Sequence, residues 1–248
     1  MSIVSVKVQA ESPEIAENLA ESFLSRLENV FAFSLFNIQN DLVLYYVSVF
    51  GQPPIRTNSY LVLSQDSGDR QHWALEGIYR SIELSKLLKL DARYFSKHVE
   101  KISGKDLTKM EKRLSLAVDF CGLAIRSIGQ PSSFVQAVTA LECLFSMGRA
   151  NIESSVSDHY AFILGRSLEE RLELKKKIRR LYDIRSDLAH GARSTIKKSD
   201  CREAIACAQN AIFAFLFDDK LSGIIDEKSF KEYIDTLKFD VGEGNKNI

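Results

Sequence analysis

The stretch Leu181 to Gly191, which reads LYDIRSDLAHG, closes a long amphipathic pattern. Ser167, followed three residues later by Glu170, has the form of a capping box, so we expect a helix to begin there. Gly191 suits the left-handed residue just past a helix end. Apolar residues at alternating steps of four and three indicate one helix face, and this face runs through Leu174, Ile178, Leu181, Arg185 and Leu188. Arg185 is therefore predicted to lie within the apolar stripe.

Arg185 and His190 are the two chemically versatile side chains of this stretch. Burying a guanidinium without a partner costs several kcal/mol, so Arg185 must line a cleft or interface or be paired. The pattern leaves a structural and a functional Arg185 equally open. His190 lies five residues on, about 140° further round an ideal helix, so contact between the two within one helix is not automatic. On spacing alone, His190 is a favourable partner for the helix dipole.

Two upstream segments supply further candidates. The segment FVQAVTALECLF at 134–145 has the apolar spacing of a helix, and Glu142 borders its stripe. A carboxylate at the edge of a core needs a partner, and Arg185 is a candidate because it has the complementary need on its own helix. A structural role for Glu142 is favoured over one in proton transfer. The segment HYAFILG at 159–165 predicts a short helix, in which His159 is packed or capping, with an auxiliary site role as the alternative.

These three segments, in this order, resemble the HEPN superfamily, whose signature is Arg-x4-6-His, and its Apea-like branch in particular. The resemblance covers about residues 70 to 218. It implies a helical bundle that dimerises and, in many members, a metal-independent ribonuclease of defence or toxin–antitoxin systems. Other members are binding modules without catalysis. We therefore expect RNA and a second copy of this chain as partners, an antitoxin or defence protein as a further partner, and no cofactor or metal.

Cleavage of RNA makes modest demands on a protein, because the substrate supplies its own nucleophile, the 2′-hydroxyl. Histidine is suited to take the hydroxyl proton, which we assign to His190. The planar donors of Arg185 suit the phosphate in the transition state. The resemblance implies a 2′,3′-cyclic phosphate product. We assign Asp187 to orienting His190 or Arg185, while Ser186 stands where the family often has Asn, Asp or His.

Charge supports this assignment only locally. The whole chain has 33 Lys or Arg and 33 Asp or Glu, whereas residues 166–202 hold twelve Lys or Arg against six Asp or Glu. Such a run is usually a solvated helix face, but beside the candidate pair it would favour a phosphate backbone. Little aromatic interleaving accompanies it, so base stacking is not supported. The predicted RNA-binding residues are Lys175, Lys176, Lys177, Arg179, Arg180, Arg193, Lys197 and Lys198.

Composition sets the broad class. With 248 residues, 45% apolar and 27% charged, the chain resembles an ordinary soluble globular protein. Its four cysteines form no CxxC pair and are expected to be free thiols in a reducing compartment. No basic region precedes a long apolar run, so we expect a cytoplasmic protein without a membrane span. The lack of a Gly-rich phosphate loop or a metal-ligand cluster leaves a nucleotide-handling enzyme as the weakest alternative.

We predict a mainly α fold with three parts. A small α+β region covers residues 1–65, a HEPN-like helical bundle covers residues 66–240, and a disordered tail covers residues 241–248. The expected N-terminal elements are a strand at Val4–Val8, a helix from Pro13 to Asn29 that buries Ile15, Leu19, Phe23 and Leu27, and strands at Phe31–Phe36, Leu42–Phe50 and Tyr60–Leu63. From Trp73 the pattern is helical, with core stripes through Leu114, Val118, Cys121, Ile125 and Ile128, through Phe134, Val138, Leu141 and Phe145, and through Cys201, Ile205, Ala208, Ile212 and Phe215.

Overall fold

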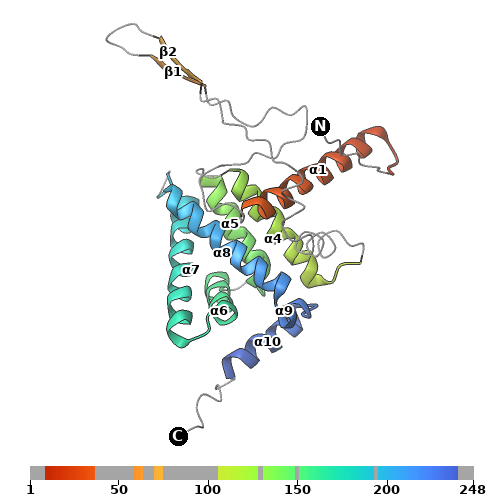
Figure 1. The fold of residues 1–248 in the computed structure, drawn as a ribbon, viewed down its shortest axis with the longest axis vertical. Coiled ribbons are helices and arrows are strands. Elements are labelled where there is room, and N and C mark those ends of the chain that lie inside the picture. Colours follow the sequence, from red (N-terminus) through yellow and green to blue (C-terminus); the bar gives the residue numbers. More distant parts are fainter. Residues whose placement is uncertain are drawn as a thin grey trace. The chain divides into compact units, whose positions relative to one another are not determined.

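The chain is mainly helical, as the sequence predicts, and it divides into two compact units, residues 1–90 and 91–248 (Figure 1). The structure is a computed structural model. It describes residues 9–36, 59–63, 70–74, 106–127, 131–148, 151–192 and 195–239.

The first unit contains α1 (Pro13–Phe36) and an antiparallel pair, β1 (Ser59–Leu63) and β2 (Arg70–Ala74). The strand predicted at Phe31–Phe36 is wrong, because α1 continues through it. This segment is rich in residues that favour strands, but it has no Gly or Pro to stop the helix. Intrinsic strand propensity is weak enough for the continuing helix to override it. A helical pattern starting at Trp73 is also wrong at its first residues, since Trp73 pairs with Tyr60 across the sheet.

The apolar side expected of α1 is not buried either. Ile15, Leu19 and Phe23 are all exposed, because periodicity indicates which face is apolar but not whether anything covers it. The α+β region expected over residues 1–65 is thus not supported as a whole. The predicted elements at 4–8, 42–50 and 75–90, and the tail at 241–248, lie outside the described residues.

The second unit is a helical bundle built around α5. In this bundle α5 packs against α4 and α8, while α6 packs along α7 (Figure 1). The predicted stripes of α5 and α8 are fully buried, as are the four described members of the α4 stripe. The helices are α4 (Lys109–Arg126), α5 (Pro131–Phe145), α6 (Ile152–Leu164), α7 (Leu168–Ala189), α8 (Lys198–Phe217), α9 (Asp219–Ser222) and α10 (Glu227–Phe239).

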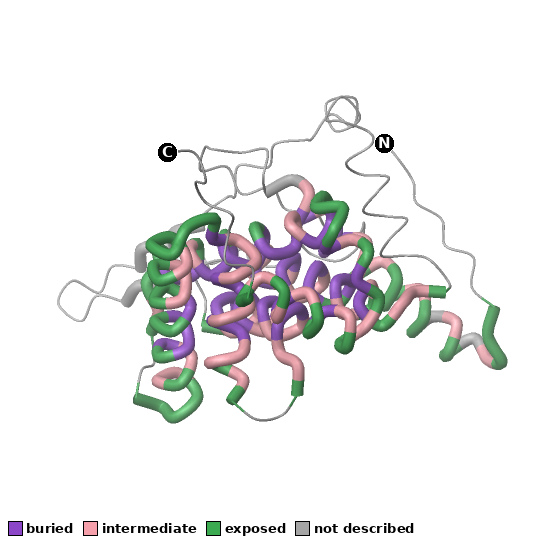
Figure 2. The backbone as a smooth tube through the Cα atoms, turned by 90° about the horizontal axis from the view of Figure 1, so that it is seen from below, coloured by how far each residue is buried: buried purple, intermediate pink, exposed green. Residues whose placement is uncertain are grey.

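An aromatic cluster joins four of these helices. The ring of Phe145 at the end of α5 lies 5.9 Å from the rings of Tyr160 and Phe215 and 6.5 Å from that of Phe230. All four side chains are buried, and Figure 2 shows the buried residues gathered on the inner sides of the bundle. The C-terminal end of α5 is therefore fixed by packing on α6, α8 and α10.

None of the helices that the structure describes is long and apolar enough to cross a membrane. All four cysteines are free thiols, as expected; Cys121, Cys201 and Cys207 are buried and Cys143 is partly exposed.

The aromatic cluster predicts a large effect of truncating Phe145. We expect Phe145→Ala to lower the free energy of unfolding by about 3–5 kcal/mol, because the fully buried ring leaves a cavity between four helices. Urea denaturation measures this change. Leu116→Ala is the matched control, since Leu116 lies on α4 but is 51% exposed, and we expect its effect to stay within about 0.5 kcal/mol. Equal losses for both variants would contradict the placement of the core.

Candidate functional site

The helix α7 carries the candidate site, and its two ends are those that the sequence predicts. The Ser167 side chain accepts a hydrogen bond from the backbone N–H of Glu170 at 3.1 Å, which caps the first turn. At the other end His190 is the C-terminal cap, and Gly191 has a φ of 72°, the left-handed region that favours glycine. Arg185 and His190 therefore lie in the last turn of α7 and immediately beyond it.

Arg185 pairs with Glu142, for which the sequence offers it as a candidate partner. Its Nη2 atom lies 3.4 Å from Glu142 Oε2, and the two side chains are 37% and 17% exposed. The second carboxylate oxygen, Oε1, accepts a hydrogen bond from the hydroxyl of Tyr182 at 3.1 Å. The Arg185 guanidinium carbon also lies 6.0 Å from the centre of the Tyr182 ring. One carboxylate of α5 thus holds two side chains of α7.

Tyr182 is a site residue that sequence reasoning missed. It precedes Arg185 by three residues and so shares its side of the helix, which is the only signal that the sequence offers. The side chain is buried, and burial, followed by the negative charge of Glu142, raises the pKa of the Tyr182 phenol well above its ordinary value. The phenol therefore keeps its proton and donates a hydrogen bond to Glu142.

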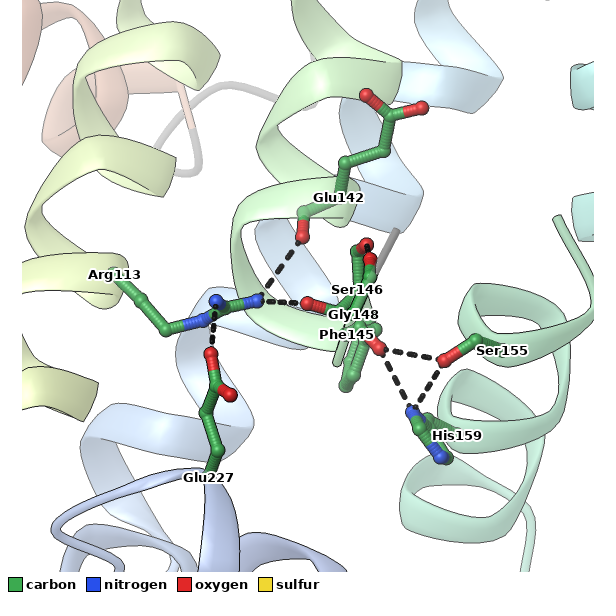
Figure 3. Close-up of polar contacts among 8 residues, drawn as sticks. All are labelled: Arg113, Glu142, Phe145, Ser146, Gly148, Ser155, His159 and Glu227. Atoms are coloured by element: carbon green, nitrogen blue, oxygen red, sulfur yellow. Dashed lines mark hydrogen bonds and ion pairs between the residues drawn. The ribbon is translucent and has the colours of Figure 1, made fainter. Parts of the chain in front are cut away.

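The backbone of Glu142 is fixed from the opposite side by Arg113 of α4. Arg113 Nη2 donates to the carbonyl oxygens of Glu142, at 3.5 Å, and of Ser146, while Nη1 donates to Glu227 Oε1 of α10 at 3.1 Å. The Glu142 carbonyl also accepts the backbone N–H of Ser146 at 3.0 Å, so Arg113 adds a second donor to it and links the end of α5 to α10. Figure 3 shows the Glu142 carboxylate directed away from Arg113. The side chain of Glu142 therefore contacts α7, while its backbone carbonyl contacts α4.

His190 and Ser186 are both exposed. The backbone N–H of His190 donates to the Ser186 carbonyl at 2.9 Å, and no residue that the structure describes hydrogen-bonds the His190 imidazole. On a regular helix, five residues separate Arg185 and His190 by about 7.5 Å along the axis and about 140° around it. Both side chains are thus accessible near the same end of α7. The helix geometry does not require them to touch each other.

Asp187 lies on another side of α7, because two residues turn a helix by about 200°. It lines an open pocket of about 510 Å³ between α7 and the start of α8. Of the two roles expected for Asp187, orienting Arg185 is disfavoured by this position, and orienting His190 stays a prediction. The pocket is lined by Arg180, Asp183, Ile184, Asp187, Thr195, Ile196, Lys197 and Asp200.

The predicted RNA-binding cations fall into two groups. Three are engaged within the bundle: Lys175 pairs with Asp158, Lys177 lies 4.0 Å from Glu203, and Arg180 binds both Glu203 and Asp200, the latter at 2.9 Å. The hydrogen bond to Asp200 is the main reason that the pKa of Arg180 is raised. The exposed cations that form no ion pair with a described residue are Lys176, Arg179, Lys197 and Lys198; Arg193 lies outside the described residues.

His159 is a packed residue of α6, the first of the two roles considered for it. Its Nδ1 atom lies 2.8 Å from the carbonyl oxygen of Phe145 and 3.3 Å from Ser155 Oγ (Figure 3). Its ring meets that of Phe230 edge to face at 5.2 Å. The helix begins at Ile152, earlier than predicted. His159 therefore ties α6 to the end of α5 and to α10.

Within the described ranges, no group of three or more His, Cys, Asp or Glu side chains is arranged to hold a metal ion. The Cys143 thiol, which adjoins Glu142, is not activated, since burial raises its pKa to about 11.

No protein-family model, curated protein or solved structure matches this chain. The chemistry of the site therefore has to come from its own residues. Those with both accessibility and suitable chemistry are Arg185, His190 and the four exposed cations that pair with no described acidic residue, Lys176, Arg179, Lys197 and Lys198.

The environment of His159 predicts a pH dependence of stability. Burial is the main cause that lowers the pKa of His159 from its ordinary 6.5, so below pH 6.5 the unfolded chain binds this proton more readily than the folded one. The stability due to neutral His159 is present above pH 6.5 and is lost as the pH falls towards the folded-state pKa. We expect His159→Gln to reduce the slope of unfolding free energy between pH 7 and pH 5, measured by urea denaturation at each pH. An unchanged slope would contradict the packed, neutral imidazole.

Proposed function

We propose that this protein is a metal-independent RNA endonuclease of the HEPN type that acts in a defence or toxin–antitoxin context. The observation that carries the proposal is the state of Arg185. Its guanidinium is more than one-third exposed and meets Glu142 through a single nitrogen at 3.4 Å, so it has donors left for a phosphate. The exposed His190 follows near the same end of α7.

In the proposed reaction, His190 takes the proton from the 2′-hydroxyl of RNA. The 2′-oxygen forms a bond to phosphorus, the bond from phosphorus to the 5′-oxygen breaks, and the imidazolium returns its proton to the departing oxygen. Arg185 stabilises the charge on the phosphorus oxygens in the transition state. The products carry a 2′,3′-cyclic phosphate and a 5′-hydroxyl. Asp187 orients His190, and Ser186 supplies a nearby hydroxyl.

The proposal extends to the surroundings of the site. Two copies of the chain would bring two Arg185–His190 pairs to a shared cleft, and the free cysteines are compatible with the reducing cytoplasm that we propose. Exposed Lys176, Arg179, Lys197 and Lys198 would attract the RNA backbone. An antitoxin or defence protein would act as the regulator.

One observation favours a second candidate function, a non-catalytic HEPN dimer that binds RNA or protein. Arg185 is engaged with Glu142 and beside Tyr182, as a structural arginine joining two helices would be. Removal of a structural Arg185 would leave the partly buried Glu142 with one donor fewer, and the cost would exceed the roughly 0–1 kcal/mol of an exposed ion pair. An unchanged melting temperature of Arg185→Ala with loss of cleavage supports the ribonuclease, whereas strong destabilisation supports the binding module.

The ribonuclease predicts cleavage of RNA in excess chelator. We expect wild-type protein to yield fragments with 2′,3′-cyclic phosphate ends and to leave DNA of the same sequence intact, because DNA lacks the nucleophile. His190→Ala should slow cleavage by about 100-fold or more, and Arg185→Lys by a similar factor, since lysine keeps the charge but loses the planar donors. End-group analysis by mass spectrometry identifies the product. Absence of cleavage by folded wild-type protein would refute the proposal.

Because some of these cations are paired with acidic residues and others are not, neighbouring lysines should differ in how much their substitution weakens RNA binding. Lys176→Gln should weaken binding of a single-stranded RNA about threefold and reduce the slope of log Kd against log salt by about 0.7, because an accessible phosphate contact is lost. Lys177→Gln is the matched control, since its ammonium already lies against Glu203. Fluorescence anisotropy from 50 to 300 mM salt measures both. A larger effect at Lys177 would place the RNA on another side of α7.

A further inference from the structure

The Glu142 carboxylate divides its two oxygens between two donors. Oε2 faces Arg185 Nη2 at 3.4 Å, and Oε1 accepts the hydroxyl of Tyr182 at 3.1 Å. An arginine beside a free carboxylate forms two parallel N–H···O bonds where it can, and this bidentate pairing is the stronger one. Here the hydrogen bond from the buried Tyr182 hydroxyl to Oε1 holds the carboxylate in an orientation in which Oε2 faces Arg185. Arg185 is consequently restricted to a single-nitrogen contact.

We propose that Tyr182 is a positioning residue for the phosphate-binding Arg185: its hydroxyl fixes the orientation of the Glu142 carboxylate, so that Glu142 meets the guanidinium through Oε2 alone. The inference rests on the proposed ribonuclease, in which Arg185 meets the RNA phosphate. Tyr182 itself contacts no substrate in this scheme. Its effect reaches the RNA through Glu142 and Arg185.

Three properties suit Tyr182 to this role. Its side chain is buried, which fixes the ring, and the high pKa of its phenol keeps the proton in place for donation. The Arg185 guanidinium, 37% exposed, lies against the ring of the same tyrosine. Substitution by phenylalanine would remove the hydroxyl alone and leave this ring contact intact.

Loss of the Tyr182 hydroxyl has a definite consequence for binding. The Glu142 carboxylate is then free to rotate, both of its oxygens can face Arg185 in a bidentate pair, and a phosphate must compete with this intramolecular carboxylate. We expect Tyr182→Phe to raise the Kd for a 2′-O-methylated RNA, which cannot be cleaved, by about tenfold. The KM for cleavable RNA should rise by a similar factor, with a smaller change in kcat.

The experiment is a double-mutant cycle with Tyr182→Phe and Glu142→Gln. A glutamine amide has one acceptor oxygen and no charge, so it cannot form the competing bidentate pair, and the Tyr182→Phe effect on Kd should vanish in the Glu142→Gln background. The side-chain 15Nε signal of Arg185, assigned by its loss in Arg185→Lys, should show slower guanidinium rotation in Tyr182→Phe alone. Tyr160→Phe is the matched control, because it removes another buried tyrosine hydroxyl in the same bundle.

An equal Kd increase in both backgrounds, or a Kd unchanged by Tyr182→Phe, would overturn the proposal. So would an effect of Tyr160→Phe as large as that of Tyr182→Phe, since a general loss of packing would then suffice. The proposed ribonuclease is tested separately, because wild-type protein that does not cleave RNA refutes the enzyme. The role of Tyr182 is still decided by the double-mutant cycle, measured as the Kd for the uncleavable RNA and as the 15Nε signal of Arg185.

Discussion

The carboxylate of Glu142 is the constraint on which the arrangement of α7 depends. A charged group that is only 17% exposed requires donors, and both donors come from α7, three residues apart on one side of that helix. The backbone of the same residue is fixed by Arg113 of α4, and the next aromatic along α5, Phe145, is held in the aromatic cluster. A rigid α5, together with α6, which packs along α7, therefore sets the rotation of α7 about its own axis.

That rotation determines which side chains of α7 reach solvent. Leu172 and His190 are eighteen residues apart, which is five full turns, and both are exposed. Lys176 and Arg179 lie between them and are exposed too, whereas Lys175 and Arg180 turn towards acidic residues of α6 and α8. Adjacent cations in the run of basic residues thus differ in role because neighbouring helices supply carboxylates to only some of them.

The sequence predicts well what depends on local geometry. The cap at Ser167, the left-handed Gly191 and the buried stripes of α5 and α8 follow from spacing alone, and the Glu142–Arg185 pair follows from two charges that each need a partner at an apolar edge. The strand assigned to Phe31–Phe36 fails because β propensity is easily overridden within a continuing helix. Tyr182 was missed because a hydrogen bond between helices depends on their relative rotation, which no single sequence contains. The pairing of Lys177 and Arg180 with α8 is hidden for the same reason.

A structural and a chemical role of Arg185 are compatible in this geometry. A partly exposed, single-nitrogen ion pair contributes about 0–1 kcal/mol, so a phosphate can take the guanidinium without unfolding the bundle. The carboxylate left behind would ordinarily be costly, because breaking a buried pair strands a charge. Here Glu142 keeps the hydrogen bond from Tyr182, and its surroundings stay partly hydrated. The same tyrosine that keeps Arg185 from a closed pair also supports Glu142 when Arg185 turns to another anion, so α7 can exchange partners while its packing on α5 persists.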